Sequence, residues 1–82
     1  MTKADVMDVI KNEKLEDYNW FDDHNIKQDE VGIRTDGNTW LVYTSDERAN
    51  PISEKQFDSE SEALDNFIKR LRAKNKFKKL YK

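Results

Sequence analysis

An Asp-Gly dipeptide, residues 36–37, divides residues 30–44 into two short runs that alternate between apolar and polar side chains. An Asp-Gly pair between such runs is among the strongest short-range signals for a β-hairpin. The hairpin constrains the fold strongly because it fixes two antiparallel strands and determines which side chains share a face. A polar stretch follows at residues 45–51, and residues 52–57 predict a third, antiparallel strand.

The turn also predicts which residues of the hairpin lie opposite each other. With the Asp-Gly dipeptide as the two-residue turn, Ile33 faces Trp40 and Val31 faces Val42. A shift of the register by one residue would exchange the two faces of the sheet. In the predicted register, the opposite face receives the remaining large side chains of the second strand, Leu41 and Tyr43.

Amphipathic helices are predicted on both sides of the strands. Thr2 and Asp5 fit an N-terminal capping signal for a helix at about residues 3–13, in which Val6, Val9 and Ile10 recur at helical spacing. Ser59 and Glu62 form a capping-box signal for a second helix. An apolar stripe at helical spacing then predicts its buried face: Ala63, Leu64, Phe67, Ile68 and Leu71.

Together these elements predict an α+β fold with the order α-β-β-β-α. We expect a two-layer sandwich in which a three-stranded antiparallel sheet packs against two helices. Residues 1–82 form a single domain, with a basic tail from about residue 75 that we expect to be mobile. Residues 15–26 show neither period clearly and are assigned to a loop, with a short strand at Tyr18–Phe21 as the alternative.

Charge is distributed unevenly along the chain. Residues 1–65 carry all 17 acids against seven bases, a formal charge of −10, whereas residues 66–82 carry eight bases and no acid, a formal charge of +8. One interpretation is an acidic body with a basic arm that contacts nucleic acid. The other is structural, because cations near the C-terminal end of a helix complement its dipole and the remaining bases form a solvated tail. The acidic body would repel phosphates, so we expect no nucleic-acid partner.

The residues needed for common catalytic sites are scarce. The sequence has no cysteine and one histidine, and neither glycine opens a helix as a phosphate-binding loop would require. His24 stands among acids in a spacing that matches no established metal site, so we expect it to be exposed to solvent. The sequence therefore predicts neither an enzyme nor a metal or cofactor site. It also lacks a signal peptide and any run of ~20 apolar residues, so we expect a cytoplasmic protein.

Residues 32–48 and 57–68 resemble small immunity proteins that are encoded beside polymorphic toxins in Gram-positive bacteria, and they look most like immunity family fifty-nine. The similarity covers roughly residues 15–72. It rests on the Asp-Gly hairpin and on the helix that begins Ser-Glu-Ser-Glu-Ala-Leu. The resemblance implies a non-enzymatic antidote that binds one cognate toxin domain, and it transfers no functional residues.

The composition of the loops predicts where such a partner would bind. Many antibacterial toxins are nucleases with cationic clefts, to which an acidic inhibitor would be steered electrostatically. If both helices cover one sheet face, apolar side chains on the other face become an anchor within an acidic rim. The alternative is that Trp20 and Phe21 cover this face. The predicted partner-binding residues are Asp22, Asp23, Asp29, Glu30, Leu41, Tyr43, Asp46 and Glu47. The alternative function is that of a small regulatory or adaptor protein that contacts nucleic acid through its basic C-terminal arm.

Overall fold

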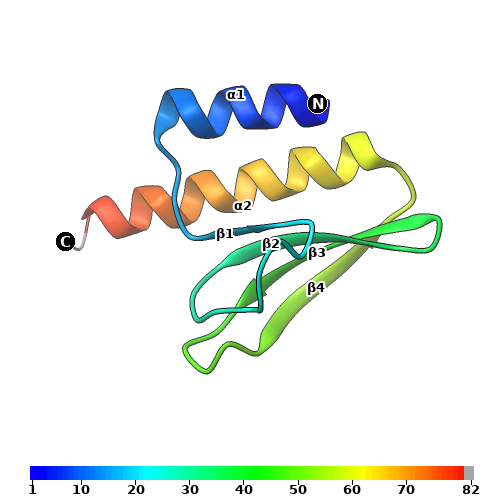
Figure 1. Ribbon diagram of the computed structural model, residues 1–82. Helices are drawn as coiled ribbons and strands as arrows, with labels where there is room; N and C mark the ends of the chain where they lie inside the picture. The colour runs from blue at the N-terminus through cyan, green and yellow to red at the C-terminus, as the bar shows by residue number, and fades with distance from the viewer. Residues whose placement is uncertain (81–82) are drawn as a thin grey trace.

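A computed structural model of the chain describes residues 1–80, with side chains through Phe77. Tyr81 and Lys82, which belong to the predicted basic tail, lie outside the described residues. Figure 1 shows two helices on one side of a sheet. The elements, in chain order, are α1 (Lys3–Glu13), β1 (Tyr18–Trp20), β2 (Val31–Asp36), β3 (Thr39–Ser45), β4 (Pro51–Phe57) and α2 (Glu60–Leu80).

The sheet has four strands in the order β1-β2-β3-β4, so the prediction of three antiparallel strands is wrong. The additional strand is β1, which confirms the short strand at Tyr18–Phe21 that was the alternative to a loop, one residue shorter than predicted. It pairs with β2 in parallel, whereas β2, β3 and β4 are antiparallel as predicted. Two adjacent parallel strands require a connection that carries the chain back across the sheet. Here residues 21–30 make this connection without a helix.

The hairpin of β2 and β3 has the predicted faces but a different register. Ile33 pairs with Val42 and Val31 with Thr44, because Gly37 and Asn38 form the turn instead of Asp36 and Gly37. Gly37 has a φ of 64°, a backbone conformation that favours glycine. A shift of two residues leaves every side chain on its predicted face, since side chains along a strand alternate with period two.

Both helices begin as their capping residues predict. At α1, the Thr2 side chain accepts a hydrogen bond from the Asp5 amide, and the Asp5 side chain accepts one from the Thr2 amide. At α2, the Glu62 amide donates to Ser59 Oγ at 3.1 Å. The second helix is longer than predicted, because its backbone remains helical through Leu80, where the sequence indicated a tail from about residue 75.

The core lies between the sheet and the helices. It includes side chains from α1, β2, β3 and α2, and the rings of Trp20 and Phe21 pack against it on the same side. In Figure 1, α2 lies directly over the sheet, and α1 runs alongside α2 in the same direction. Ion pairs connect α2 to α1 and to the N-terminus that precedes it: the N-terminal amine lies 3.1 Å from Asp65 Oδ1, Lys3 lies 3.8 Å from Glu60, and Arg72 lies 2.6 Å from Glu13.

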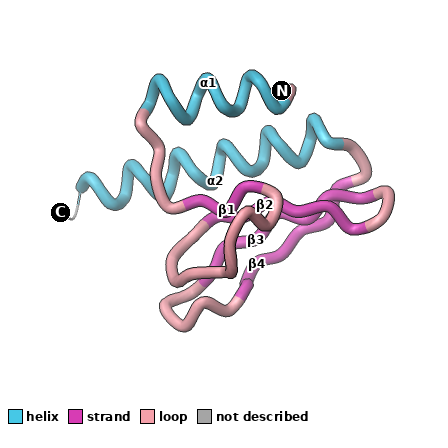
Figure 2. The backbone as a smooth tube through the Cα atoms, viewed as in Figure 1, coloured by secondary structure: helices cyan, strands magenta, loops and turns pink. Residues whose placement is uncertain are grey.

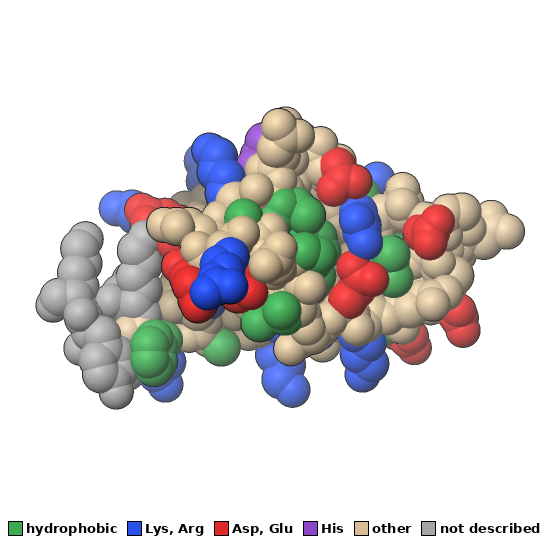
Figure 3. All heavy atoms as spheres, turned by 90° about the horizontal axis from the view of Figure 1, so that it is seen from below, with side chains coloured by type: hydrophobic (Ala, Val, Ile, Leu, Met, Phe, Trp, Pro, Cys, Tyr) green, Lys and Arg blue, Asp and Glu red, His purple; other side chains and the backbone are tan. Residues whose placement is uncertain are grey.

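The opposite face of the sheet carries no helix. Figure 3 shows this face, where hydrophobic side chains near the centre are bordered by acidic and basic ones. Arg34 and Glu54 form an ion pair of 2.7 Å across β2 and β4, and Leu41 is half-buried. The connection between β1 and β2 also covers part of this face, so the face is only partly open.

Candidate functional site

Two loops at one end of the sheet contain the six predicted acids. The first loop, residues 21–30, precedes β2, and the second, residues 46–50, follows β3 (Figure 2). Because β2 and β3 are antiparallel, the start of one lies beside the end of the other, and Val31 pairs with Thr44. Acids that are distant in the sequence thus meet at one edge of the molecule.

Hydrogen bonds fix the two loops to each other. The Asp29 amide donates to the Asp46 carbonyl at 3.1 Å, and the Ser45 amide donates to the Glu30 carbonyl at 2.7 Å. Ser45 is 2% exposed, and its Oγ accepts from the Glu30 amide at 2.6 Å and donates to the Lys27 carbonyl at 2.7 Å. The acidic side chains are therefore presented from a framework that is bonded together before any partner arrives.

The six acids divide into exposed and structural groups. Asp22, Asp23, Asp29 and Glu47 are exposed. Asp46 is half-buried, and its Oδ1 accepts hydrogen bonds from the Arg48 and Asn50 amides at 2.9 Å each, so it shapes its own loop. Glu30 is only 5% exposed, which removes it from the predicted partner-binding surface.

His24 is not the solvent-exposed residue that the sequence predicted. Its side chain is 29% exposed, and it lies between two carboxylates: Nδ1 is 2.5 Å from Asp23 Oδ1 and Nε2 is 2.7 Å from Glu30 Oε2. The hydrogen bond with Glu30 is the largest cause that raises the pKa of His24 above its usual range, and Asp23 adds to it. The position of the two acids depends on the loop fold, so residue spacing alone did not indicate it.

Tyr43 does not form an exposed anchor, and this prediction is wrong. Its side chain is completely buried, and its ring lies on Gly32, its cross-strand partner, so that a Cβ at position 32 would collide with the ring. Burial first, and then the charge of Asp22 and of Glu30, raise the pKa of Tyr43 to about 12. A glycine beside a large aromatic residue could have indicated this packing.

The loop of residues 21–30 covers Tyr43, but the rings of Trp20 and Phe21 take no part in this. Asn19 shares a sheet face with Gly32 and Tyr43, and its Nδ2 donates to the His24 carbonyl at 3.0 Å, which holds the loop on this face. Trp20 instead lies 5.7 Å from Phe67, ring centre to ring centre, in the core beneath the helices. Neither Leu41 nor Tyr43 is therefore a fully exposed apolar residue.

An open depression of about 660 Å³ lies beside these groups. Its lining residues are Asp22, His24, Asn25 and Ile26. Residues 1–80 contain no group of three or more histidine, aspartate or glutamate side chains arranged to hold a metal ion. The chemistry of the site is thus that of an acidic protein surface with one apolar side chain, suited to a cationic partner.

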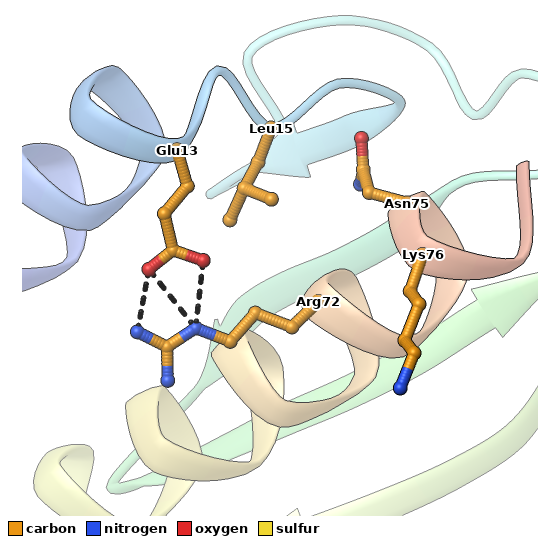
Figure 4. A pocket seen from close by; sticks show the side chains of 5 residues that line it. All are labelled: Glu13, Leu15, Arg72, Asn75 and Lys76. Atoms are coloured by element: carbon orange, nitrogen blue, oxygen red, sulfur yellow. Dashed lines mark hydrogen bonds and ion pairs between the residues drawn. The ribbon is translucent and has the colours of Figure 1, made fainter. Parts of the chain in front are cut away.

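A second depression, of about 400 Å³, lies between the end of α1 and α2 (Figure 4). Arg72 donates to both carboxylate oxygens of Glu13, and the two side chains point toward each other. Asn75 is buried, accepts a hydrogen bond from the Glu16 amide at 2.8 Å and donates to the Glu16 carbonyl at 3.0 Å. Arg72 and Asn75 thus attach the basic helix to the last residue of α1 and to the segment that follows it.

Comparisons with protein-family models, with curated proteins and with solved structures found no match. In the described part of the chain, no helix is long and apolar enough to cross a membrane.

Proposed function

We propose that this protein is a non-catalytic binding protein, an immunity protein that neutralises a cognate toxin domain in the cytoplasm. It contacts the toxin through the acidic rim, which we define as Asp22, Asp23, Asp29, Asp46 and Glu47. The resemblance of residues 32–48 and 57–68 to immunity proteins supplies the class of partner. The loops of residues 21–30 and 46–50 supply the surface that would contact the toxin.

The observation that carries the proposal is the fixed arrangement of the rim. Residues 29 and 46 are joined by a backbone hydrogen bond, and the buried Ser45 side chain bonds to the first loop at Lys27 and Glu30. A surface that is ordered before binding loses less conformational entropy when a partner docks. The rim therefore combines concentrated negative charge with an ordered backbone.

A cationic surface is the chemistry that this rim fits. A nuclease domain binds phosphates through a positively charged cleft, and complementary charge accelerates the encounter of two proteins. Glu30 and Tyr43 are buried and act beneath the rim, where they support the loop instead of contacting the partner. Most of the rim consists of exposed carboxylates, whose main effect on binding is on the association rate.

Nucleic-acid binding through the basic C-terminal arm is the alternative function. Two of its bases already bond within the protein, since Arg72 pairs with Glu13 and Arg70 Nη1 donates to Thr44 at 3.3 Å. Lys74 lines a depression together with Asp17 and Asp29. These acids stand beside the arm and would repel phosphates, so the geometry favours a protein partner.

Co-expression with the product of the adjacent toxin gene tests the proposal. We expect the two chains to co-purify as a complex and the protein to protect bacteria that express the toxin domain. Retention of the protein on a nucleic-acid column, without any complex with the toxin domain, would support the alternative instead.

A further inference from the structure

The loop of residues 21–30 lies over one face of the sheet. Its second half is bonded to Ser45 and Asp46 through residues 27, 29 and 30, whereas its first half is held by a different set of polar contacts. His24 bridges Asp23 and Glu30, and the Lys27 amide donates to Glu30 Oε1 at 2.9 Å. Asn19, on β1, donates a hydrogen bond from Nδ2 to the His24 carbonyl at 3.0 Å. Beneath the closed loop lies the buried ring of Tyr43. The histidine is thus central to the contacts that keep the loop in place.

Glu30 gives the histidine a specific electrostatic role. The side chain of Glu30 is 7% exposed, and a carboxylate that has left water in this way requires a nearby positive charge or several hydrogen-bond donors. Among the side chains that the structure describes, which end at Phe77, His24 forms the only ion pair of Glu30. Protonated His24 balances this buried negative charge and can donate to both Asp23 and Glu30. Neutral His24 carries a single N–H, so it loses the charge and can donate to only one of the two carboxylates.

The backbone of the loop opposes closure. Phe21, Asp22 and Asp29 have φ angles of 50°, 55° and 55°, in the left-handed region that non-glycine residues adopt at a cost. The cost is greatest for a bulky residue such as Phe21, since aspartate tolerates this region better. Side-chain contacts must compensate for this backbone conformation, and the His24 bridge is among the contacts available to do so.

We propose that His24 is a pH-sensitive latch: its protonated ring holds residues 21–26 closed over Tyr43, and loss of the proton releases this half of the loop. Two members of the acidic rim, Asp22 and Asp23, lie on this segment, so the latch controls their placement. The inference does not depend on the identity of any partner.

The charged groups around the latch set the direction of the change with pH. Asp23 and Glu30 contact the histidine ring, while Asp22 and Arg34 are the other charges that act on the underlying Tyr43. The neighbouring Asn19 on β1 and Ser45 on β3 carry no charge. The two carboxylates raise the pKa of His24 above 6.5, the ordinary value for histidine. The loop is therefore most securely closed below that value, and it opens as the pH rises through the raised pKa.

Amide hydrogen exchange measured by NMR tests the latch directly. The informative amides are those of Asp23 and Lys27, which donate to the Trp20 carbonyl and to Glu30 Oε1. After correction for the intrinsic pH dependence of exchange, we expect both to exchange several-fold faster at about pH 8.5 than at about pH 6, across the range in which histidine titrates. The amides of β3, outside the loop, should keep their protection. Equal corrected rates in the loop at the two pH values would overturn the proposal.

Two substitutions separate charge compensation from simple hydrogen bonding. His24→Gln removes the positive charge and should leave the loop open at both pH values. Glu30→Gln keeps an acceptor for the Lys27 amide but removes the buried charge, so its loop should stay closed at both pH values. A Glu30→Gln variant that opens at both values, or that keeps the wild-type pH dependence, would contradict the latch. Protection of β3 in each variant confirms that the protein remains folded.

Discussion

The ring of Tyr43 lies against Gly32, and the two residues are cross-strand partners on β3 and β2. Gly32 has no side chain to displace the ring, and the loop of residues 21–30 closes over the pair. This packing explains why Tyr43 is completely buried on a sheet face that carries no helix. It also connects the sheet to the loop that carries most of the acidic rim.

Replacing Gly32 with alanine should destabilise the protein. The new Cβ would collide with the Tyr43 ring, and the ring is too tightly enclosed to move freely, so we expect a loss of about 1–3 kcal/mol in the free energy of unfolding. Urea denaturation measures the change. Gly37→Ala is the comparison, because a Cβ there would meet no atom within 4 Å and only the φ of 64° opposes the substitution. A Gly32→Ala variant as stable as the wild type would contradict the packing.

Tyr43→Phe tests the buried hydroxyl. In the described part of the chain this oxygen has no hydrogen-bond partner, so its removal should change the stability at neutral pH by less than ~1 kcal/mol. At alkaline pH the two proteins should differ. The pKa of Tyr43 is raised from 10.0 to about 12, so the folded state resists ionisation and the wild type loses stability as the pH rises through this range.

The phenylalanine variant lacks this ionisation and should lose less stability between those pH values. Urea denaturation at neutral and alkaline pH measures the difference between the proteins. Parallel losses in the two proteins would show that Tyr43 ionises as readily when folded as when unfolded.

The start and the buried face of α2 can be tested separately. Ser59→Ala removes the acceptor for the Glu62 amide and should cost roughly 1 kcal/mol. Phe67→Ala removes a completely buried ring and should cost about 3–5 kcal/mol. Thermal and urea unfolding measure both effects. Small and equal losses would mean that α2 is not docked on the sheet as described.

Asn75 should contribute more to stability than the ion pair beside it. Asn75→Ala leaves the amide and carbonyl of Glu16 without the buried side-chain amide that they both contact, and we expect a loss of about 1–3 kcal/mol. Arg72→Ala breaks an exposed ion pair with Glu13 and should cost less than ~1 kcal/mol. The reverse order of effects would show that the basic helix is attached mainly by charge.

Local signals predicted the helices and the faces of the hairpin correctly. Thr2 and Ser59 cap their helices as expected, and Val31, Ile33 and Val42 all lie in the core. The register was wrong by two residues because such a shift preserves the alternation of side chains, so the pattern fits either turn. The sequence had no means of choosing between a turn at residues 36–37 and one at 37–38.

The remaining errors concern contacts between distant segments. The strand Tyr18–Trp20 was predicted only as the alternative to a loop, because three residues are too few to show a period. Its parallel pairing with β2 was not predicted, because that pairing exists only in the assembled sheet. The connection from this strand to β2 covers Tyr43 and places His24 between Asp23 and Glu30. Residue spacing could show neither arrangement. The extension of α2 to Leu80 was also missed, because the buried contacts of Asn75 with Glu16 depend on the docking of α1.

Binding kinetics with the cognate toxin domain test the acidic rim most directly. Asp22→Asn, Asp29→Asn and Glu47→Gln are combined, because asparagine tolerates the left-handed backbone at residues 22 and 29. Asp23 and Asp46 are kept, because the first contacts His24 and the second accepts hydrogen bonds within its own loop. The matched control combines Asp8→Asn, Asp36→Asn and Glu62→Gln, which are exposed acids outside the two loops with the same total change in charge. We expect the rim variant to associate more slowly with the toxin and to show a weaker dependence on salt, whereas the control should associate nearly as fast as the wild type. Equal association rates for the rim variant and the control, at both low and high salt, would contradict the proposed docking surface.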